Sequence, residues 1–414
     1  MKRVLILSAS AGAGHVRAAE AIEKALSRHE GIEVRHEDAL HYTNAAFRRV
    51  YSRAYINMVN RAPKVLGLLY DWADKPWKDE RQRLAFDRLN TLPLVNMLNR
   101  HKPDLVISTH FLPSEIMSWL ICRKRVETKN VVVVTDFDVH SMWLCHHYYR
   151  YFVALDETWV HMTQLGFAPD RVVVSGIPVD PVFEIAKDKT EMRLKYGLDP
   201  TVPTIYMSMG GHGVGPTEEI VTALSQIRHD AQVLAMCGKN EELIGRLHQL
   251  NQSFEGRSRL KIHPVGYTHD VDEYMAASDM VLGKPGGLTT SEALCKGLGF
   301  VIVNPIPGQE ERNSDHLLEE GAAIRCNNLP TLAYKVDNLL GDRERLARMK
   351  ENALRLSHAD AANTIVNTLL NNESDRSVVS QTAHRCATMR ERAVKATRRA
   401  TGSLVSRLKR KRRM

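Results

Sequence analysis

A twice-repeated alternation of short apolar strands and helical segments constrains the fold of this chain more than any other feature. Strands that alternate with helices form parallel sheets, because each helix carries the chain back to the start of the next strand. The first series ends at Gly176-Ile-Pro-Val-Asp-Pro181, whose prolines exclude a helix interior and disfavour a central strand. The predicted strands are residues 3–8, 33–38, 104–109, 131–135, 151–154, 171–175, 204–209, 231–236, 260–265, 280–282, 300–303 and 322–325.

The pattern predicts an α/β protein with two doubly wound, Rossmann-like domains, since 414 residues exceed one ordinary hydrophobic core. Ligands of such sheets bind beyond the carboxyl ends of the strands, so we expect the two domains to face each other across a cleft. The expected divisions are an N-terminal domain over 1–177 with an insertion at 41–79, a connection over 178–202, a C-terminal domain over 203–355, a closing helix over 356–372 and a basic tail over 373–414.

The bulk composition is that of an ordinary soluble globular protein, with 43% hydrophobic and 25% charged residues. No apolar run approaches the roughly 18–20 residues that cross a bilayer. Met1-Lys2-Arg3 leads directly into a strand, which does not fit a signal peptide. The six cysteines are scattered without a Cys-x-x-Cys pair, which argues against zinc and disulfides and favours a reducing cytoplasm.

The last residues carry the excess of positive charge. Residues 376–414 contain 13 Lys and Arg and one acid, Glu391, for a net charge of +12, whereas residues 1–375 have a net charge of −3. A polybasic segment binds phosphates, either those of anionic lipid headgroups or those of nucleic acid. The alternative is a disordered tail that increases solubility. Nothing in residues 1–375 supports a nucleic-acid function, so nucleic acid is not an expected partner.

Residues 41–79 interrupt the strand–helix rhythm with aromatic and basic side chains. Such a mixture outside the core favours contact with a membrane surface or a lipid channel. An extra pair of helices packed on the first domain explains it equally well, and a surface that stacks nucleic-acid bases is less favoured. The side chains are Tyr42, Phe47, Tyr51, Tyr55, Tyr70, Trp72 and Trp77, with Arg48, Arg49, Arg53, Arg61, Lys64, Lys75 and Lys78.

The segment Lys284-Pro-Gly-Gly-Leu-Thr-Thr-Ser-Glu292 follows a predicted strand and starts a helix. Unpaired backbone N–H groups at a helix start attract anions, and the two glycines allow a diphosphate to approach closely. We expect Thr289 or Thr290 to cap the helix, and Glu292, one turn later, to accept hydrogen bonds from a ribose diol. The alternative is a strand–helix turn whose glycines serve packing and whose glutamate is solvated.

Further turns in the second half are expected beside this segment. Met209-Gly-Gly-His-Gly-Val-Gly215 is a second anion-binding turn, and two such turns in one domain strengthen the prediction of a phosphate site. Gln309 and Glu310 begin a helix after a strand and offer paired hydrogen bonds to sugar hydroxyls. The strand ends at Gly238 and Tyr267 are expected to flank the same nucleotide.

The first strand ends in a glycine turn, Ser8-Ala-Ser-Ala-Gly-Ala-Gly-His15. The spacing is not G-x-G-x-x-G, and no acid about 20 residues later fits a ribose, so a dinucleotide site is weakly supported. Imidazole titrates near neutral pH, so His15 at the mouth of the cleft is a candidate general base or a hydrogen-bond partner of an acceptor hydroxyl. The more common role of a single histidine is structural.

The segment Val134-Thr-Asp-Phe-Asp-Val-His-Ser-Met-Trp143 follows a fully apolar strand. This position predicts that Asp136, His140 and Trp143 lie at the edge of the cleft. Asp136 is a candidate base or a residue that orients His15. Asp136 and Asp138 match the D-x-D metal motif, but the match is short and we expect no metal there.

Together these residues resemble the monogalactosyldiacylglycerol synthases and the processive diacylglycerol glucosyltransferases of glycosyltransferase family 28, and more distantly the peptidoglycan N-acetylglucosaminyltransferase. The resemblance covers residues 1 to about 370. Its most specific parts are Gly12-Ala-Gly-His15, Thr135-Asp136 with His140 and Trp143, Lys284-Pro-Gly-Gly-Leu-Thr289, Glu292 and Pro307-Gly-Gln-Glu310.

The resemblance implies a GT-B fold and a UDP-sugar donor bound by the C-terminal domain, with inversion at the anomeric carbon and with neither a metal nor another cofactor. The implied roles are ribose binding by Glu292, uracil binding near Tyr267, hexose binding by Gln309 and Glu310, diphosphate binding by Gly210, Gly211, Gly286, Gly287, Leu288 and Thr289, acceptor binding by Gly14, His140 and Trp143, and catalysis by His15 and Asp136.

The implied acceptor is diacylglycerol or a glycosyl-diacylglycerol, reached by peripheral, monotopic attachment to the anionic cytoplasmic face of the cell membrane. The long basic tail departs from the family pattern and supports such attachment. The transferred sugar stays open among glucose, galactose and glucuronic acid, and so does the number of sugars added. The alternatives are a soluble UDP-sugar epimerase, against which the insertion and the tail argue, and a glycosyltransferase with another lipid acceptor.

Overall fold

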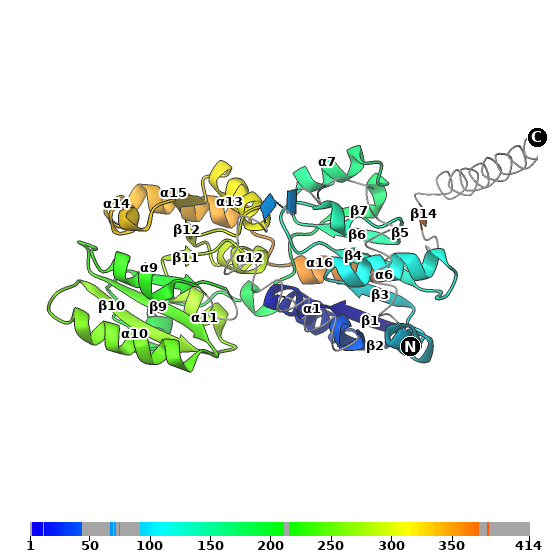
Figure 1. Ribbon diagram of the computed structural model, residues 1–414, viewed down its shortest axis with the longest axis horizontal. Helices are drawn as coiled ribbons and strands as arrows, with labels where there is room; N and C mark the ends of the chain where they lie inside the picture. Colours follow the sequence, from blue (N-terminus) through cyan, green and yellow to red (C-terminus); the bar gives the residue numbers. More distant parts are fainter. Residues whose placement is uncertain are drawn as a thin grey trace, which may run out of the picture.

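The computed structural model describes residues 2–10, 12–43, 67–68, 70–71, 74, 92–210, 215–371 and 379–380. These residues form two α/β halves side by side, each built on a six-stranded sheet (Figure 1). All strand pairs within the two sheets are parallel. The prediction of two doubly wound domains is therefore confirmed.

The first sheet has the strand order β2-β1-β3-β4-β6-β7 and lies between helices on both faces. Val4 and Ile6 pack under α1, whereas Leu5 and Leu7 pack against α5 and α6, because successive side chains of a strand point to opposite faces. The strands and helices of this half are β1 (Lys2–Ser8), α1 (Ala13–Leu26), β2 (Ile32–Asp38), α5 (Leu92–His101), β3 (Leu105–Ser108), α6 (Phe111–Cys122), β4 (Lys129–Val133), β5 (His147–Tyr148), β6 (Arg150–Val153), α7 (Asp156–Gln164) and β7 (Val172–Val174).

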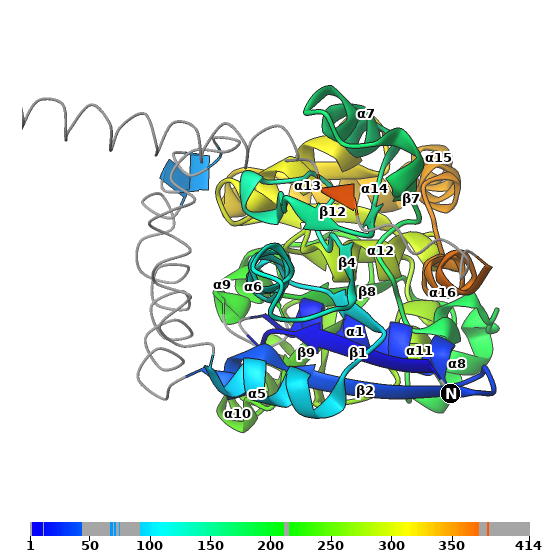
Figure 2. The same cartoon turned by 90° about the vertical axis from the view of Figure 1, so that its right-hand side faces the viewer.

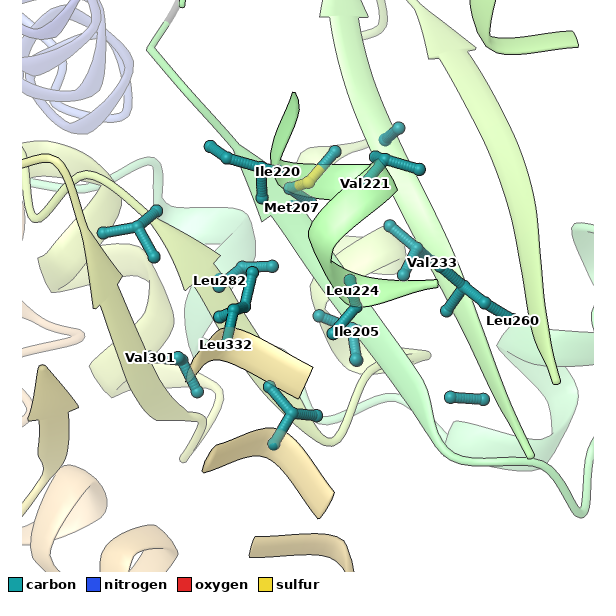
Figure 3. Packing of buried hydrophobic residues seen from close by; sticks show 14 of the residues in the cluster. Ile205, Met207, Ile220, Val221, Leu224, Val233, Leu260, Leu282, Val301 and Leu332 are labelled. Carbon is teal, nitrogen blue, oxygen red and sulfur yellow. The ribbon is translucent and has the colours of Figure 1, made fainter. Parts of the chain in front are cut away.

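The second sheet has the strand order β10-β9-β8-β11-β12-β13. On one of its faces, Ile205, Leu282 and Val301 pack against Leu224 and Leu332 of the covering helices (Figure 3). The elements are α8 (Lys189–Lys195), β8 (Thr204–Ser208), α9 (Thr217–Leu224), β9 (Ala231–Gly238), α10 (Glu241–Phe254), β10 (Leu260–Gly266), α11 (Val271–Ala276), β11 (Met280–Gly283), α12 (Gly287–Cys295), β12 (Gly299–Val303), α13 (Gln309–Glu319), β13 (Ala323–Cys326), α14 (Leu332–Gly341) and α15 (Arg343–Arg355).

Each sheet has a point at which the direction of strand addition reverses. In the first sheet β1 lies between β2 and β3, and in the second sheet β8 lies between β9 and β11. Loops at the carboxyl ends of such strands turn away from each other and leave a crevice between them. The turn after β1 leads into α1 and the turn after β11 leads into α12, and these two helices contact each other at the boundary between the halves (Figure 1).

The helix α16 (Ala361–Asn371) returns from the second half to the first (Figures 1 and 2). Its Ile365, Val366 and Leu369 belong to the same buried cluster as the side chains between α1 and the first sheet. The preceding helix, α15, contributes Met349 to the core of the second half. The two last described helices, α15 and α16, thus pack on different halves.

All twelve predicted strands are present, and their ends differ from the prediction by at most two residues. Most of the predicted insertion at 41–79, the tail from 373 apart from β14 (Val379–Ser380), and Gly211 lie outside the described residues. β14 pairs antiparallel with β5.

Candidate functional site

A cavity of about 440 Å³ opens between the two halves, at the points where the strand order of each sheet reverses. Its walls come from the start of α1 on one side, and from the ends of β8, β9 and β10 and the start of α12 on the other. The residues predicted for the site that line this cavity are Gly14, Gly210, Tyr267, Leu288, Thr289 and Glu292. Five predicted donor-binding residues of the second half therefore share one cavity. The other described ones, Gly286, Gly287, Gln309 and Glu310, are not among its lining residues.

His15 lies in the first turn of α1, and its Nδ1 forms hydrogen bonds with residues of the first half. Its Nδ1 is 3.1 Å from the carbonyl oxygen of Thr109 and 2.7 Å from Oγ1 of Thr135. A carbonyl oxygen can only accept, so Nδ1 carries the proton and Nε2 keeps its lone pair. Burial lowers the pKa of His15, against an opposing effect of Asp136. His15 is therefore a neutral base, and its Nε2 has no hydrogen-bond partner among the residues that the structure describes.

His110, which the sequence prediction missed, packs edge-to-face on His15, with 4.6 Å between the ring centroids. Its Nδ1 accepts a hydrogen bond from the N–H of Leu112 at 3.0 Å and so caps the start of α6. Burial, together with the neighbouring His15, lowers the pKa of His110 well below its ordinary value. The available signal was the polar pair Thr109-His110 directly after the apolar strand β3.

Helix α12 begins directly against the first half. A Cβ atom on Gly287 would lie 2.4 Å from the carbonyl oxygen of Thr135, so only glycine permits this approach. The N-cap is Gly286 and no side chain caps the helix, so the predicted capping by Thr289 or Thr290 is wrong. The first N–H groups of the helix have no intrahelical partners and carry the positive end of its dipole, which makes an anion site at the cavity wall.

Glu292 is buried one turn into α12, and its side chain is only 2% exposed. Its Oε1 accepts a hydrogen bond in an ion pair with Nη2 of Arg17, which reaches across from α1. Its Oε2 has no hydrogen-bond partner in the described part of the chain. Burial raises the pKa of Glu292 to about 7, although Arg17 acts in the opposite direction. A buried oxygen without a partner at a cavity wall is a position that a ligand hydroxyl can fill. Arg17 was not predicted from the sequence.

Asp136, predicted to be catalytic, has both carboxylate oxygens occupied. Oδ1 accepts a hydrogen bond from Nε2 of Gln309 at 2.7 Å, and Oδ2 accepts one from Nε1 of Trp143 at 3.1 Å. Asp136 acts on His15 through its negative charge, which raises the pKa of His15. Because Gln309 lies in the second half and Trp143 in the first, Asp136 connects the predicted hexose-binding and acceptor-binding sides of the site.

The predicted acceptor residues His140 and Trp143 are buried, each 1% exposed, and neither is among the residues that line the cavity. Nδ1 of His140 accepts a hydrogen bond from the N–H of Met142 at 3.1 Å, and Nε2 donates to the carbonyl oxygen of Tyr70 at 2.9 Å. Burial lowers the pKa of His140. With both ring nitrogens occupied, His140 supports the loop after β4 as a neutral side chain.

Tyr267 and Glu310 have contrasting surroundings. Tyr267 is 60% exposed at the cavity rim, with Nζ of Lys239 4.9 Å from its ring centroid, and such a ring can stack on a planar base. Oε2 of Glu310 accepts a hydrogen bond from the N–H of Ile306 at 2.7 Å. Burial raises the pKa of Glu310 to about 7. Glu310 thus holds the loop before α13, and Oε1 faces the turn at Gly286.

Helix α13 carries further polar contacts between the halves that the sequence did not predict. Arg312 bridges Asp138 at 2.6 Å and Asp74 at 2.5 Å. Asn313, which is 1% exposed, accepts a hydrogen bond from the N–H of Phe137 at 3.3 Å. These pairs depend on how the halves are packed, which no local sequence pattern reports. One acid of the D-x-D match, Asp138, is thus engaged by an arginine.

Among the described residues, no group of three or more His, Cys, Asp and Glu side chains is arranged to hold a metal ion. Over the same residues, no helix combines the length and the apolar character needed to cross a bilayer.

Two family models match this chain. Residues 15–179 match the monogalactosyldiacylglycerol (MGDG) synthase model, and residues 217–365 match the glycosyltransferase family 28 C-terminal domain. The processive diacylglycerol β-glucosyltransferase of Staphylococcus aureus is 30% identical over 353 residues, which cover 84% of this chain and 87% of that protein. The protein of the same name from Bacillus subtilis is 29% identical over 384 residues, 92% of this chain and 98% of that protein.

Solved structures show the same architecture. MurG of Acinetobacter baumannii superposes with a TM-score of 0.56 at 15% identity and covers 90% of this chain and 100% of its own. Staphylococcus aureus MnaA with UDP superposes with a TM-score of 0.59 at 15% identity and covers 91% and 99%. These matches span both sheets and show the GT-B fold. With the family models and the curated relatives, they establish that the chain belongs to the glycosyltransferase family of monogalactosyldiacylglycerol synthases and processive diacylglycerol β-glucosyltransferases.

Proposed function

We propose that this protein transfers a hexose, with inversion, from a UDP-sugar to diacylglycerol or to a glycosyl-diacylglycerol at the cytoplasmic face of the cell membrane. One observation carries the proposal: a neutral His15 with a free Nε2 stands at the start of α1, and the opposite wall of the adjoining cavity is the start of α12 with Glu292. Gly14 and Val16, the neighbours of His15 in the chain, line the cavity, and the anion site lies in its opposite wall. A base beside the cavity and an anion site in its wall are the two groups that such a transfer needs.

The proposed donor occupies the second half. The diphosphate binds at the start of α12, where Leu288 and Thr289 line the cavity, as Gly210 does, and where Gly286 and Gly287 are the N-cap and the first residue of the helix. Gly211 completes the proposed set of diphosphate-binding residues. Glu292 binds the ribose and Tyr267 stacks on the uracil. Gln309 and Glu310 bind the hexose. The supporting observations are the position of Thr289 and Glu292 in the cavity wall and the unpartnered Oε2 of Glu292.

The proposed chemistry is one displacement. The acceptor oxygen attacks the anomeric carbon while the bond from that carbon to the diphosphate oxygen breaks, and the bonding pair leaves with UDP. Nε2 of His15 takes the proton of the acceptor hydroxyl. The N–H groups at the helix start and the Thr289 hydroxyl stabilise the charge that develops on the diphosphate, in the role that a metal ion has elsewhere. Asp136 positions Gln309 through a hydrogen bond, and its negative charge raises the pKa of His15.

The names of the relatives support glucose as the hexose and a β-linked product. The diphosphate of a UDP-hexose is α-linked, so a β-linked product requires attack from the opposite face, which is inversion. The same names support diacylglycerol as the acceptor. We further propose that the insertion at 41–79 and the basic residues after 376 bring the enzyme to anionic lipid. A UDP-sugar epimerase is not favoured, because the curated relatives are glucosyltransferases.

The test is to incubate the protein with diacylglycerol in anionic vesicles and, in parallel, with UDP-glucose, UDP-galactose or UDP-glucuronic acid. Mass spectrometry of the lipids gives the sugar and the number added, and NMR of the anomeric proton gives the linkage. We expect a β-glucosyl lipid and stoichiometric UDP. An α-linked product would contradict inversion, and interconversion of UDP-sugars without lipid product would contradict glycosyl transfer.

A further inference from the structure

Arg17 crosses from the first half into the wall of the donor pocket. It lies two residues after His15 on α1, and its side chain is 38% exposed, whereas the Glu292 side chain that it pairs with is 2% exposed. Both residues line the cavity. An arginine of the first half therefore contacts the most buried of the carboxylates that line the cavity.

We propose that Arg17 is a positioning residue for the donor, which holds Oε1 of Glu292 in a charge-assisted hydrogen bond so that Oε2 stays available as an acceptor for the ribose diol. This inference rests on the proposed donor site. The pair is asymmetric: Oε1 is bound to Arg17, while Oε2 is buried without a partner in the described residues. An ionised carboxylate accepts hydrogen bonds at both oxygens, whereas a protonated one must donate from one of them.

The other groups around Glu292 make a cationic partner necessary. Asp180 precedes the short helix Pro181–Glu184, and Asp272 lies on α11; both raise the pKa of Glu292, in addition to its burial. Asp180 is itself paired with Lys24, and Asp272 with Lys187 at 2.6 Å. The phenol of Tyr206, on β8, faces the same pair.

Arg17 is the cation that acts directly on the carboxylate, and it lowers the pKa of Glu292. Arg17 belongs to the first half. Glu292, which accepts the hydrogen bonds of the ribose, is therefore held in its ionised form only when α1 and α12 are in contact. Donor binding and closure of the two halves are therefore coupled through one ion pair. The same pair links the helix that carries the base to the nucleotide, since His15 and Arg17 lie two residues apart on α1.

The experiment measures the affinity of uridine and of UDP-glucose as a function of pH by NMR-monitored titration. Neither ligand ionises near neutral pH, so the pH dependence reports the protein. In the unmodified chain, affinity for both ligands falls as the pH drops below about 7, by up to tenfold per pH unit, as Glu292 takes up a proton. Glu292→Gln should bind both ligands weakly and without this pH dependence.

Arg17→Gln should move the midpoint of that dependence upward by on the order of one pH unit, with affinity restored in more alkaline buffer. Arg17→Lys, which keeps the charge, should restore most of the original midpoint. Arg28→Gln removes an exposed charge just after the same helix and should change nothing. In a Glu292→Gln background, Arg17→Gln should have no further effect. Arg17→Met keeps the apolar stem and replaces Arg17→Gln if that variant does not fold.

An unshifted midpoint in Arg17→Gln or Arg17→Met overturns the inference. So does weakening confined to UDP-glucose, since that result assigns Arg17 to the diphosphate rather than to Glu292. If the unmodified chain binds neither ligand at any pH, the proposed donor site itself fails. A failure of the inference alone is thereby distinguished from a failure of the proposed function.

Discussion

At the scale of single residues, the tautomer of His15 is determined by the oxygen atoms that contact its Nδ1. The carbonyl of Thr109 fixes the proton on Nδ1. The buried surroundings, including His110, oppose a second proton. A histidine with its proton on one nitrogen and a free lone pair on the other is ready to accept a proton without first losing one.

His15→Ala should lower the turnover number by roughly 10²–10⁴-fold while leaving UDP affinity nearly unchanged, because general base catalysis contributes in the transition state. Since burial lowers the pKa of His15 below 6.5, the unmodified enzyme keeps the neutral base down to a pH below that value. The acid limb of the turnover number at saturating donor should therefore fall below pH 6.5. Steady-state rates across pH and calorimetric titration with UDP provide the measurements.

The control for this variant is His248→Ala, which removes an exposed histidine from α10 and should leave turnover intact. Turnover near that of the unmodified enzyme in His15→Ala would remove His15 from the mechanism. Loss of UDP affinity as large as the loss of turnover would assign His15 to the donor instead.

The site residues whose place follows from the succession of strand, turn and helix were predictable from the sequence. The site residues whose role depends on packing between the two halves were not. His15 and Glu292 each follow a glycine turn between a strand and a helix, and this order indicates their place. The partner of Glu292, Arg17, is separated from it by 275 positions. Asp136 was identified from its position after a strand, but its bond to Gln309 arises only when the two halves meet.

At the scale of elements, the contact between α12 and the loop after β4 depends on the missing side chain of Gly287. Gly287→Ala should destabilise the docked arrangement by about 1–3 kcal/mol, because its Cβ would stand 2.4 Å from the Thr135 carbonyl oxygen. Activity should fall with it. Gly245→Ala on α10 is the matched control, since no atom lies within 4 Å of its Cβ, and it should stabilise by about 0.4–1 kcal/mol. Urea unfolding and turnover distinguish the two; equal behaviour would contradict the close contact.

Helix α13 is tied to the first half by Arg312, which lies between Asp74 and Asp138. Gly308, at the start of this helix with a φ of 85°, lets Tyr70 pack where a Cβ would stand 2.7 Å from the ring. Tyr70 and Asp74 therefore touch the start of α13, the helix that carries the proposed hexose-binding residues. The lipid contact that we propose for residues 41–79 and the sugar contact that we propose at α13 are thereby physically connected.

A double-mutant cycle with Asp74→Asn and Arg312→Gln should give a coupling of roughly 1 kcal/mol in unfolding free energy, because the pair is partly buried and shares a network. Lower turnover should accompany either change. Arg325 and Glu311, an ion pair within the second half, supply the control cycle, in which turnover should be unaffected. Additive effects of Asp74→Asn and Arg312→Gln on stability and turnover would show that the bridge does not connect the two halves.

At the scale of the whole molecule, charge is segregated rather than spread. Residues 1–375 carry a net charge of −3, and residues 376–414 carry +12. Deleting 376–414 should weaken binding to anionic vesicles, most strongly at low salt, because each basic residue near such a surface contributes about 1 kcal/mol. Vesicle sedimentation measures this, with neutral phosphatidylcholine vesicles as the control. Unchanged binding would leave the membrane role to other segments.

The overall fold was the most predictable level, because twelve strands and their alternation with helices follow from local hydrophobic runs. The return of α16 to the first half was not predictable in this way. Its apolar face, with Ile365, Val366 and Leu369, would suit either half. Which half it covers depends on the path of the whole chain.

That return has a consequence for the order in which the protein is made. The cluster beneath α1 is completed by Ile365, Val366 and Leu369, which are synthesised long after Val4 and Ile6. During translation the second half emerges in full before the first half receives its last covering helix. The first domain to leave the ribosome is thus the last to finish folding, and a chain interrupted before residue 361 would expose apolar surface on the half that carries His15.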